Sequence, residues 1–332
     1  MHLSKKQILI TGVYRSGTEF FSNLLNLHPE ICSTMYRINA LRFIFFKYGK
    51  KKINYKKLIF DLSKRLKNKH NFFFDEKKYL KIIDGKSYGE IYDLIMSKMY
   101  LSKKKKIWAE KNQLVWTKTS DFINLLPNGY VIHILRDPRN VLASFKYKTN
   151  SNYPACLTSV FNSYDAMKSI LENKKLNKKK FIFIKYEDLV LNPQKTLNKV
   201  FNFLDVKKIN INAKRKNFSY LNKKWIVNSS FQSQIKNSSD FNIKETLNSY
   251  KKNLDIFELN FVEKICGNLM KKFDYKINSS NNKRIHTKQL NTILDKNMLL
   301  KMGYENWKNE KKGFERFPKN PVNPKFWDKT QK

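Results

Sequence analysis

Hydrophobic residues along this chain fall into short runs that alternate with segments of helical spacing. The run 130–135 is apolar in all but one position, which is typical of a strand buried on both faces of a parallel sheet. Strands are predicted at 7–13, 107–111, 130–135 and 181–186, and helices at 16–27, 139–147, 193–204 and 254–273. This alternation predicts an α/β fold of three layers, in which helices flank a central parallel sheet.

Two regions depart from this alternation. Residues 36–106 are rich in Lys and aromatic residues, and their amphipathic spacing predicts helices that cap the sheet. After Tyr275 the sequence is polar and poor in pattern. We expect a single domain over residues 1–275, with the helical cap inserted at 36–106, and an extension at 276–332 that packs on the domain or is partly flexible.

The chain has 332 residues and a formal net charge of +40, from 67 Lys and Arg against 27 Asp and Glu. Such a charge favours polyanionic partners, namely nucleic acid, phosphates or an anionic membrane surface. Only nine of the basic residues are Arg, and the Lys residues are spread over the whole chain with many Asn and Ile. AT-rich coding gives this composition, so most of the charge is interpreted as background. A hydrophobic content of 41% excludes a disordered basic tail for most of the chain.

The sequence also bears on location. No apolar run approaches the ~20 residues of a membrane span, and the first residues contain no apolar segment of a signal peptide. The three cysteines, Cys32, Cys156 and Cys266, are far apart and form no CxxC pair. We therefore expect a soluble, cytoplasmic protein with no membrane span and no disulfide framework.

A glycine-containing turn, Gly12-Val-Tyr-Arg-Ser-Gly-Thr18, joins the first predicted strand to the first predicted helix. The backbone N–H groups of such a turn, with a helix N-terminus behind them, bind anions. A nucleoside triphosphate loop would have Lys and Ser or Thr where this chain has Thr18 and Glu19. Arg15 supplies the fixed cation instead. The alternative is an ordinary strand–helix turn in which the glycines only relieve backbone strain.

A second candidate turn, Arg136-Asp-Pro-Arg139, follows the strand 130–135 at the edge where open α/β sheets bind ligands. Ser144 lies about two helical turns further along, so Arg136 and Ser144 can share one phosphate. The alternative is that Arg136 pairs with Asp137 or caps the helix. Three of the nine arginines lie in these two turns, and Arg binds phosphate through a fork of N–H groups that Lys lacks. Their concentration favours phosphate binding.

Together these segments resemble the sulfotransferases that use 3′-phosphoadenosine 5′-phosphosulfate (PAPS). The Arg-Ser-Gly-Thr turn is similar to the 5′-phosphosulfate loop of carbohydrate, tyrosylprotein and bacterial members. Arg136 and Ser144 have the spacing of the family's 3′-phosphate motif, and Lys185-Tyr-Glu-Asp188 is similar to a third family segment. The resemblance covers residues 7–275. It implies a P-loop NTPase-like sulfotransferase fold and PAPS as the donor, with no metal ion.

The resemblance also implies roles for individual residues. The 5′-phosphosulfate would be held by Arg15, Ser16, Gly17, Thr18 and Glu19, and the 3′-phosphate by Arg136 and Ser144. Tyr186 would lie beside the adenine, and a later segment offers Ser229 or Ser230 as a further cofactor contact. Lys111, with Arg15, would stabilise the transferring sulfuryl group.

The resemblance leaves the general base and the acceptor open. Tyrosylprotein members carry a catalytic Glu shortly after His-Pro, where this chain has no acid. We name Glu110 as the first candidate for the general base, with Glu90 as a second, and expect His133 in the core. A carbohydrate or glycolipid hydroxyl is the favoured acceptor, on the side of the 36–106 cap, and nucleic acid is not expected as a partner. The alternatives are a P-loop kinase-like phosphotransferase and a basic nucleic-acid-binding protein.

Overall fold

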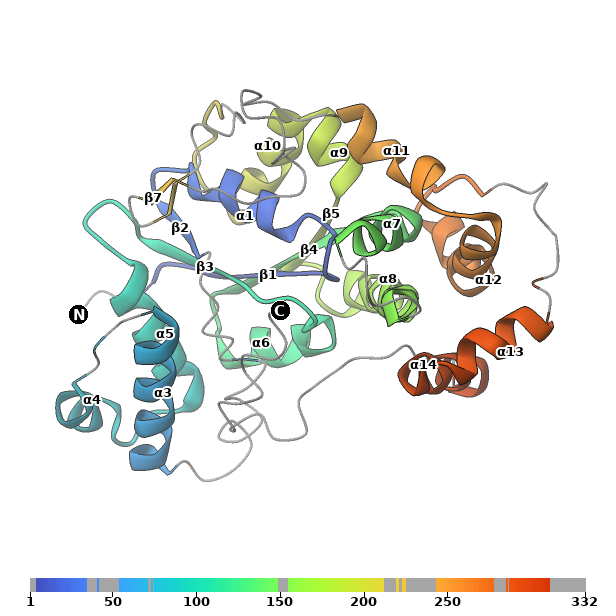
Figure 1. Ribbon diagram of the computed structural model, residues 1–332. Coiled ribbons are helices and arrows are strands. Elements are labelled where there is room, and N and C mark those ends of the chain that lie inside the picture. Colours follow the sequence, from blue (N-terminus) through green and yellow to red (C-terminus); the bar gives the residue numbers. More distant parts are fainter. Residues whose placement is uncertain are drawn as a thin grey trace.

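The computed structural model describes residues 4–34, 41, 54–70, 73, 75–148, 155–211, 219–220, 223–224, 243–277, 285 and 287–310. Five parallel strands form one sheet in the order β2-β3-β1-β4-β5 (Figure 1). Their bounds are β1 (Gln7–Thr11), β2 (Ile31–Thr34), β3 (Ile107–Lys111), β4 (Gly129–Leu135) and β5 (Phe181–Lys185). The predicted α/β fold with a central parallel sheet is confirmed.

Helices cover both faces of the sheet. On one face lie α1 (Thr18–Asn26), α9 (Tyr186–Leu191) and α10 (Pro193–Leu204), packed on Ile8, Ile10 and Ile132 (Figure 1). On the other face lie α5 (Tyr88–Tyr100), α6 (Thr119–Leu125), α8 (Thr158–Leu176) and α12 (Ile256–Lys272), packed on Leu9, Trp108 and Val131. Because successive strand residues point to opposite faces, both sets of side chains must be apolar.

The remaining elements surround this core. In chain order they are α3 (Tyr55–His70), α4 (Glu76–Ile83), η2 (Trp116–Lys118), α7 (Pro138–Lys148), η3 (Ala155–Leu157), the short strands β6 (Ser219–Tyr220) and β7 (Lys223–Lys224), α11 (Ile243–Asn253), α13 (Thr287–Asp295) and α14 (Met298–Glu310). Helix α14 packs closely on α8, since a Cβ added at Gly303 would lie 2.8 Å from the Phe161 ring. The low pattern after Tyr275 did not predict α13 and α14. The domain boundary at residue 275 stays a prediction.

The register of the central strands determines where the site lies. In β1, Ile10 is level with Lys111 of β3, and Thr11 is level with His133 of β4. The carboxyl ends of β1, β3 and β4 therefore meet at one edge of the sheet, and the turns that leave them lie close together. None of the described helices is both long and apolar enough to cross a membrane. The cytoplasmic location stays a prediction.

Candidate functional site

The turn after β1 is a tight loop whose backbone needs glycine. Gly12 and Gly17 have φ angles of +151° and +92°, and Arg15 has a φ of +68°. The Ser16 hydroxyl donates to the Val13 carbonyl at 2.8 Å, inside the loop. Because Gly17 caps the N-terminus of α1, the loop presents the free N–H groups and the positive end of the helix dipole at the edge of the sheet.

The side chains of Arg15 and Arg136 lie close together at this loop. Arg136 leaves the end of β4, and its Nη1 donates to the Arg15 carbonyl at 2.8 Å. Arg15 Nε donates to the Ser144 hydroxyl at 2.9 Å, which links the loop to α7. Burial, and next the charge of Arg136, lower the pKa of the Arg15 guanidinium below its usual value. An anion at this edge would relieve the repulsion between the two cations.

The ring of Tyr186 packs against the loop at Gly17. It is fully buried and lies 4.6 Å from the Arg136 guanidinium, face to cation. A Cβ added at Gly17 would lie 2.1 Å from this ring. The structure therefore places Tyr186 against the phosphosulfate loop, and its proposed contact with adenine stays a prediction. Ser229 and Ser230 lie outside the described residues.

The two neighbours at the end of β3 point to opposite faces of the sheet. Lys111 Nζ lies 3.8 Å from Glu19 Oε2 in the first turn of α1, on the face of the loop. The Glu110 carboxylate accepts a hydrogen bond from the Tyr92 hydroxyl, on the face covered by α5. Burial, and next the charge of Glu110, raise the pKa of Tyr92 well above its usual value. Glu110 is thus separated from Lys111, although the two are adjacent in the sequence.

The second acid named from the sequence lies at the N-terminus of α5. Glu90 completes the capping box of α5, and its carboxylate accepts from the Ser87 backbone N–H at 2.8 Å and from the Ser87 hydroxyl at 2.7 Å. These hydrogen bonds lower the pKa of Glu90 below its usual value. Its carboxylate therefore stabilises a helix end.

Sequence reasoning missed a group of polar residues at the ends of the strands. Gln113 Nε2 donates to the Thr18 hydroxyl at 3.0 Å, which ties the segment after β3 to the loop. Asn112 and Thr11 are fully buried, and their side-chain polar atoms form no hydrogen bond. His133, which was expected in the core, is fully buried as well, and its ring nitrogens form no hydrogen bond. The signal for Asn112 and Gln113 was their place directly after Lys111, at the end of a predicted strand.

His133 makes stability depend on pH. Burial lowers the pKa of its imidazole to about 3. In the unfolded chain the pKa is near 6.5, so between about pH 3 and pH 6.5 this imidazole binds a proton only on unfolding. Folding stability from this group is complete above about pH 6.5 and is lost as the pH falls toward 3. Because of His133, we expect the free energy of unfolding of the wild type, measured with denaturant, to be about 2 kcal/mol lower at pH 5 than at pH 7.

The control for this prediction is His133→Phe, which keeps an aromatic ring beside Trp116 and cannot titrate. The difference in unfolding free energy between pH 7 and pH 5 should be smaller in the variant by that amount. Equal differences in both proteins would show that His133 does not titrate on unfolding.

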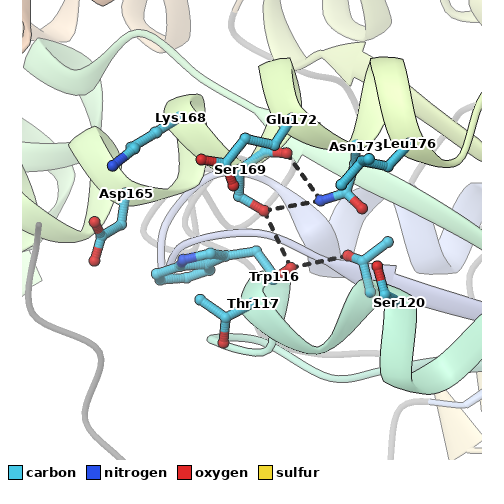
Figure 2. Close-up of a pocket in the computed structure, with 10 residues that line it drawn as sticks. Trp116, Thr117, Ser120, Asp165, Lys168, Ser169, Glu172, Asn173 and Leu176 are labelled. Atoms are coloured by element: carbon cyan, nitrogen blue, oxygen red, sulfur yellow. Dashed lines mark hydrogen bonds between the residues drawn. The ribbon is translucent and has the colours of Figure 1, made fainter.

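A polar pocket of about 420 Å³ lies between α8 and the segment η2–α6 (Figure 2). Both α8 and α6 pack on the face of the sheet opposite to α1. It is lined by Trp116, Thr117, Thr119, Ser120, Asp165, Lys168, Ser169, Glu172, Asn173 and Leu176. The Trp116 carbonyl accepts from Thr119 Oγ1 at 2.9 Å and from Ser169 Oγ at 3.1 Å, which fixes the inner wall. Trp116 also belongs to a small apolar cluster with Val13 of the loop.

Comparisons with known proteins identify a family and structures of similar fold. The model of the sulfotransferase family matches residues 7–209, more than half of the chain. The sulfotransferase domain of the Synechococcus PCC 7002 olefin synthase is similar in fold, with a TM-score of 0.53 and 15% identity over 83% of this chain and 97% of that domain. The sulfotransferase domain of the curacin biosynthetic pathway has a TM-score of 0.49 and 16% identity over 83% of this chain and 100% of that domain. No curated protein sequence matches significantly.

Proposed function

Because the chain belongs to the sulfotransferase family, we propose that this sulfotransferase moves a sulfuryl group from PAPS to a hydroxyl of a carbohydrate or glycolipid. The convergence of Arg15 and Arg136 at the carboxyl edge of the sheet carries the choice of donor. A nucleotide with phosphate groups at both the 5′ and the 3′ position offers two anions to two neighbouring cationic turns.

The two turns divide the work of binding the donor. Arg15 and the backbone N–H groups at the start of α1 would hold the 5′-phosphosulfate, where the helix dipole favours negative charge. Ser16 supports this loop through its bond to Val13. Arg136 and Ser144 would hold the 3′-phosphate, and the Arg15–Ser144 bond keeps the two subsites together.

Sulfuryl transfer asks the protein mainly to align the reactants and to stabilise charge, as phosphoryl transfer does. PAPS supplies the sulfuryl group and a phosphate as leaving group. Arg15 and Lys111 are the cations of the loop face, and Lys111 is buried, with 1% of its side chain exposed. In such a poorly hydrated position a cation stabilises developing negative charge more strongly than it does in water.

The polar pocket beside η2 supports a carbohydrate acceptor. Its hydroxyl, carboxylate and amide groups are those that form hydrogen bonds with sugar hydroxyls. Asp165 and Glu172 outweigh Lys168, so the lining has a formal charge of −1 on a chain of +40. This sign disfavours an anionic ligand there, and Trp116 shares a small apolar cluster with Val13 of the loop.

The acceptor is tested by incubating the protein with labelled PAPS and separate saccharide, lipid and small-molecule extracts. We expect label in the saccharide fraction, or in a glycolipid. Ser120 is an exposed residue of the pocket lining, and the larger side chain of Ser120→Trp partly fills the pocket. This variant should raise the KM for the acceptor about 10-fold, since it removes contacts that the acceptor makes before the reaction. Ser120→Ala is the control. Label only in molecules without a sugar would contradict the carbohydrate acceptor.

A further inference from the structure

We propose that the Glu19 carboxylate is the general base that takes the proton from the acceptor hydroxyl. This inference rests on the proposed sulfuryl transfer and concerns the same site. An ionised carboxylate accepts hydrogen bonds and donates none, so the Glu19 side chain cannot itself bind a phosphosulfate oxygen. Only its backbone N–H can serve the donor, which leaves the carboxylate for another task.

The position of Glu19 suits that task. It lies in the first turn of α1, directly after the loop, and 38% of its side chain is exposed. Lys111 Nζ is 3.8 Å away on β3, and the charge of Glu19 acts on Arg15 of the loop. The carboxylate thus borders the two cations that would stabilise the sulfuryl oxygens, and part of its side chain stays exposed.

The other described carboxylates near this edge are engaged in structural contacts. Glu110 lies on the opposite face of the sheet and accepts from Tyr92. Asp137 pairs with Arg139 at 2.6 Å. Glu187 accepts from the Asp137 backbone N–H at 2.9 Å and from the Tyr275 hydroxyl at 3.0 Å. These hydrogen bonds and this ion pair stabilise the fold around the loops. The Glu19 carboxylate lies instead beside the ammonium group of Lys111, on the face of the loop.

In the proposed step one bond to sulfur forms, one breaks, and one proton moves. The acceptor oxygen forms a bond to sulfur while the bond from sulfur to the 5′-phosphate oxygen breaks. The electron pair of that bond leaves with the phosphate, and the acceptor proton moves to Glu19 Oε2 or Oε1. Neutralising the carboxylate frees the charge of Lys111 to stabilise the negative charge that grows on the leaving phosphate.

The test compares Glu19→Gln with Glu76→Gln, a matched change in the first turn of the remote helix α4. Each protein is incubated with labelled PAPS and the saccharide mixture, and binding of adenosine 3′,5′-bisphosphate (PAP) is measured in parallel. We expect Glu19→Gln to bind PAP within about 3-fold of the wild type and to lower the transfer rate by at least about 100-fold.

A Glu19→Gln protein that transfers the sulfuryl group at the wild-type rate would overturn the role of Glu19. Loss of activity in a folded, PAP-binding Glu110→Gln protein would then assign the base to Glu110. Absence of both PAP binding and transfer in the wild type would instead overturn the proposed function itself.

Discussion

Replacing Gly17 with Ala is expected to abolish PAP binding and to lower the free energy of unfolding by about 3 kcal/mol. The new Cβ would lie 2.1 Å from Cδ2 of Tyr186, at a backbone φ of +92° that L-residues avoid. The ring cannot withdraw easily, because it is fully buried between Phe20 and the Arg136 guanidinium. The loop must therefore move, and the N–H groups that would hold the phosphosulfate move with it.

Gly85→Ala is the matched control. Gly85 also has a left-handed φ, +73°, but a Cβ there meets no atom within 4 Å. It should cost only the backbone penalty, about 1 kcal/mol, and leave PAP affinity unchanged. Chemical denaturation and a PAP titration of both variants measure the two effects. Wild-type PAP affinity in Gly17→Ala would show that the loop does not bind the nucleotide.

Arg136→Ala is expected to weaken PAP binding about 100-fold, because it removes a cation from a buried, hydrogen-bonded position. The loss has two sources. The side chain would contact the 3′-phosphate, and it also supports the loop through its bond to the Arg15 carbonyl. Arg136→Lys should recover only part of the affinity, since an ammonium group keeps the charge but loses the planar fork.

Lys178→Ala is the control for charge alone, because it removes one positive charge from an exposed position after α8. If the diffuse lysines are compositional background, this variant should bind PAP within about 2-fold of the wild type, as expected for a screened, exposed charge. Equal losses in Arg136→Ala and Lys178→Ala would contradict a specific 3′-phosphate site. Fluorescence or calorimetric titration measures both.

Four of the five strands of the sheet could be predicted from the sequence because each carries a run of apolar residues. Strand β3 has the predicted bounds, and β1, β4 and β5 differ by one or two residues at an end. Strand β2 was missed because Ile-Cys-Ser-Thr is short and half polar. Its Ser33 hydroxyl is bonded to Ser22 of α1 at 2.6 Å, so the polarity is satisfied inside the protein. A contact with the preceding helix decides this, and the alternation of apolar and polar residues within the strand does not report it.

The same distinction holds for the site. Arg15 and Arg136 could be predicted as neighbours, because turns at the carboxyl ends of parallel strands meet at one edge. The structure brings them together. Adjacency in the sequence was less informative for Glu110 and Lys111, because strand geometry sends them to opposite faces. The contact between Lys111 and Glu19 depends on how α1 packs over β3, which residue spacing does not specify.

Binding of PAP and of adenosine 5′-monophosphate to the wild-type protein tests the central claim most directly. The two nucleotides differ only in the 3′-phosphate, which Arg136 and Ser144 are proposed to hold. Titration calorimetry should show PAP binding at least about 10-fold more tightly, as expected for a charge-assisted hydrogen bond. Equal affinities, or no binding of PAP, would contradict PAPS as the donor.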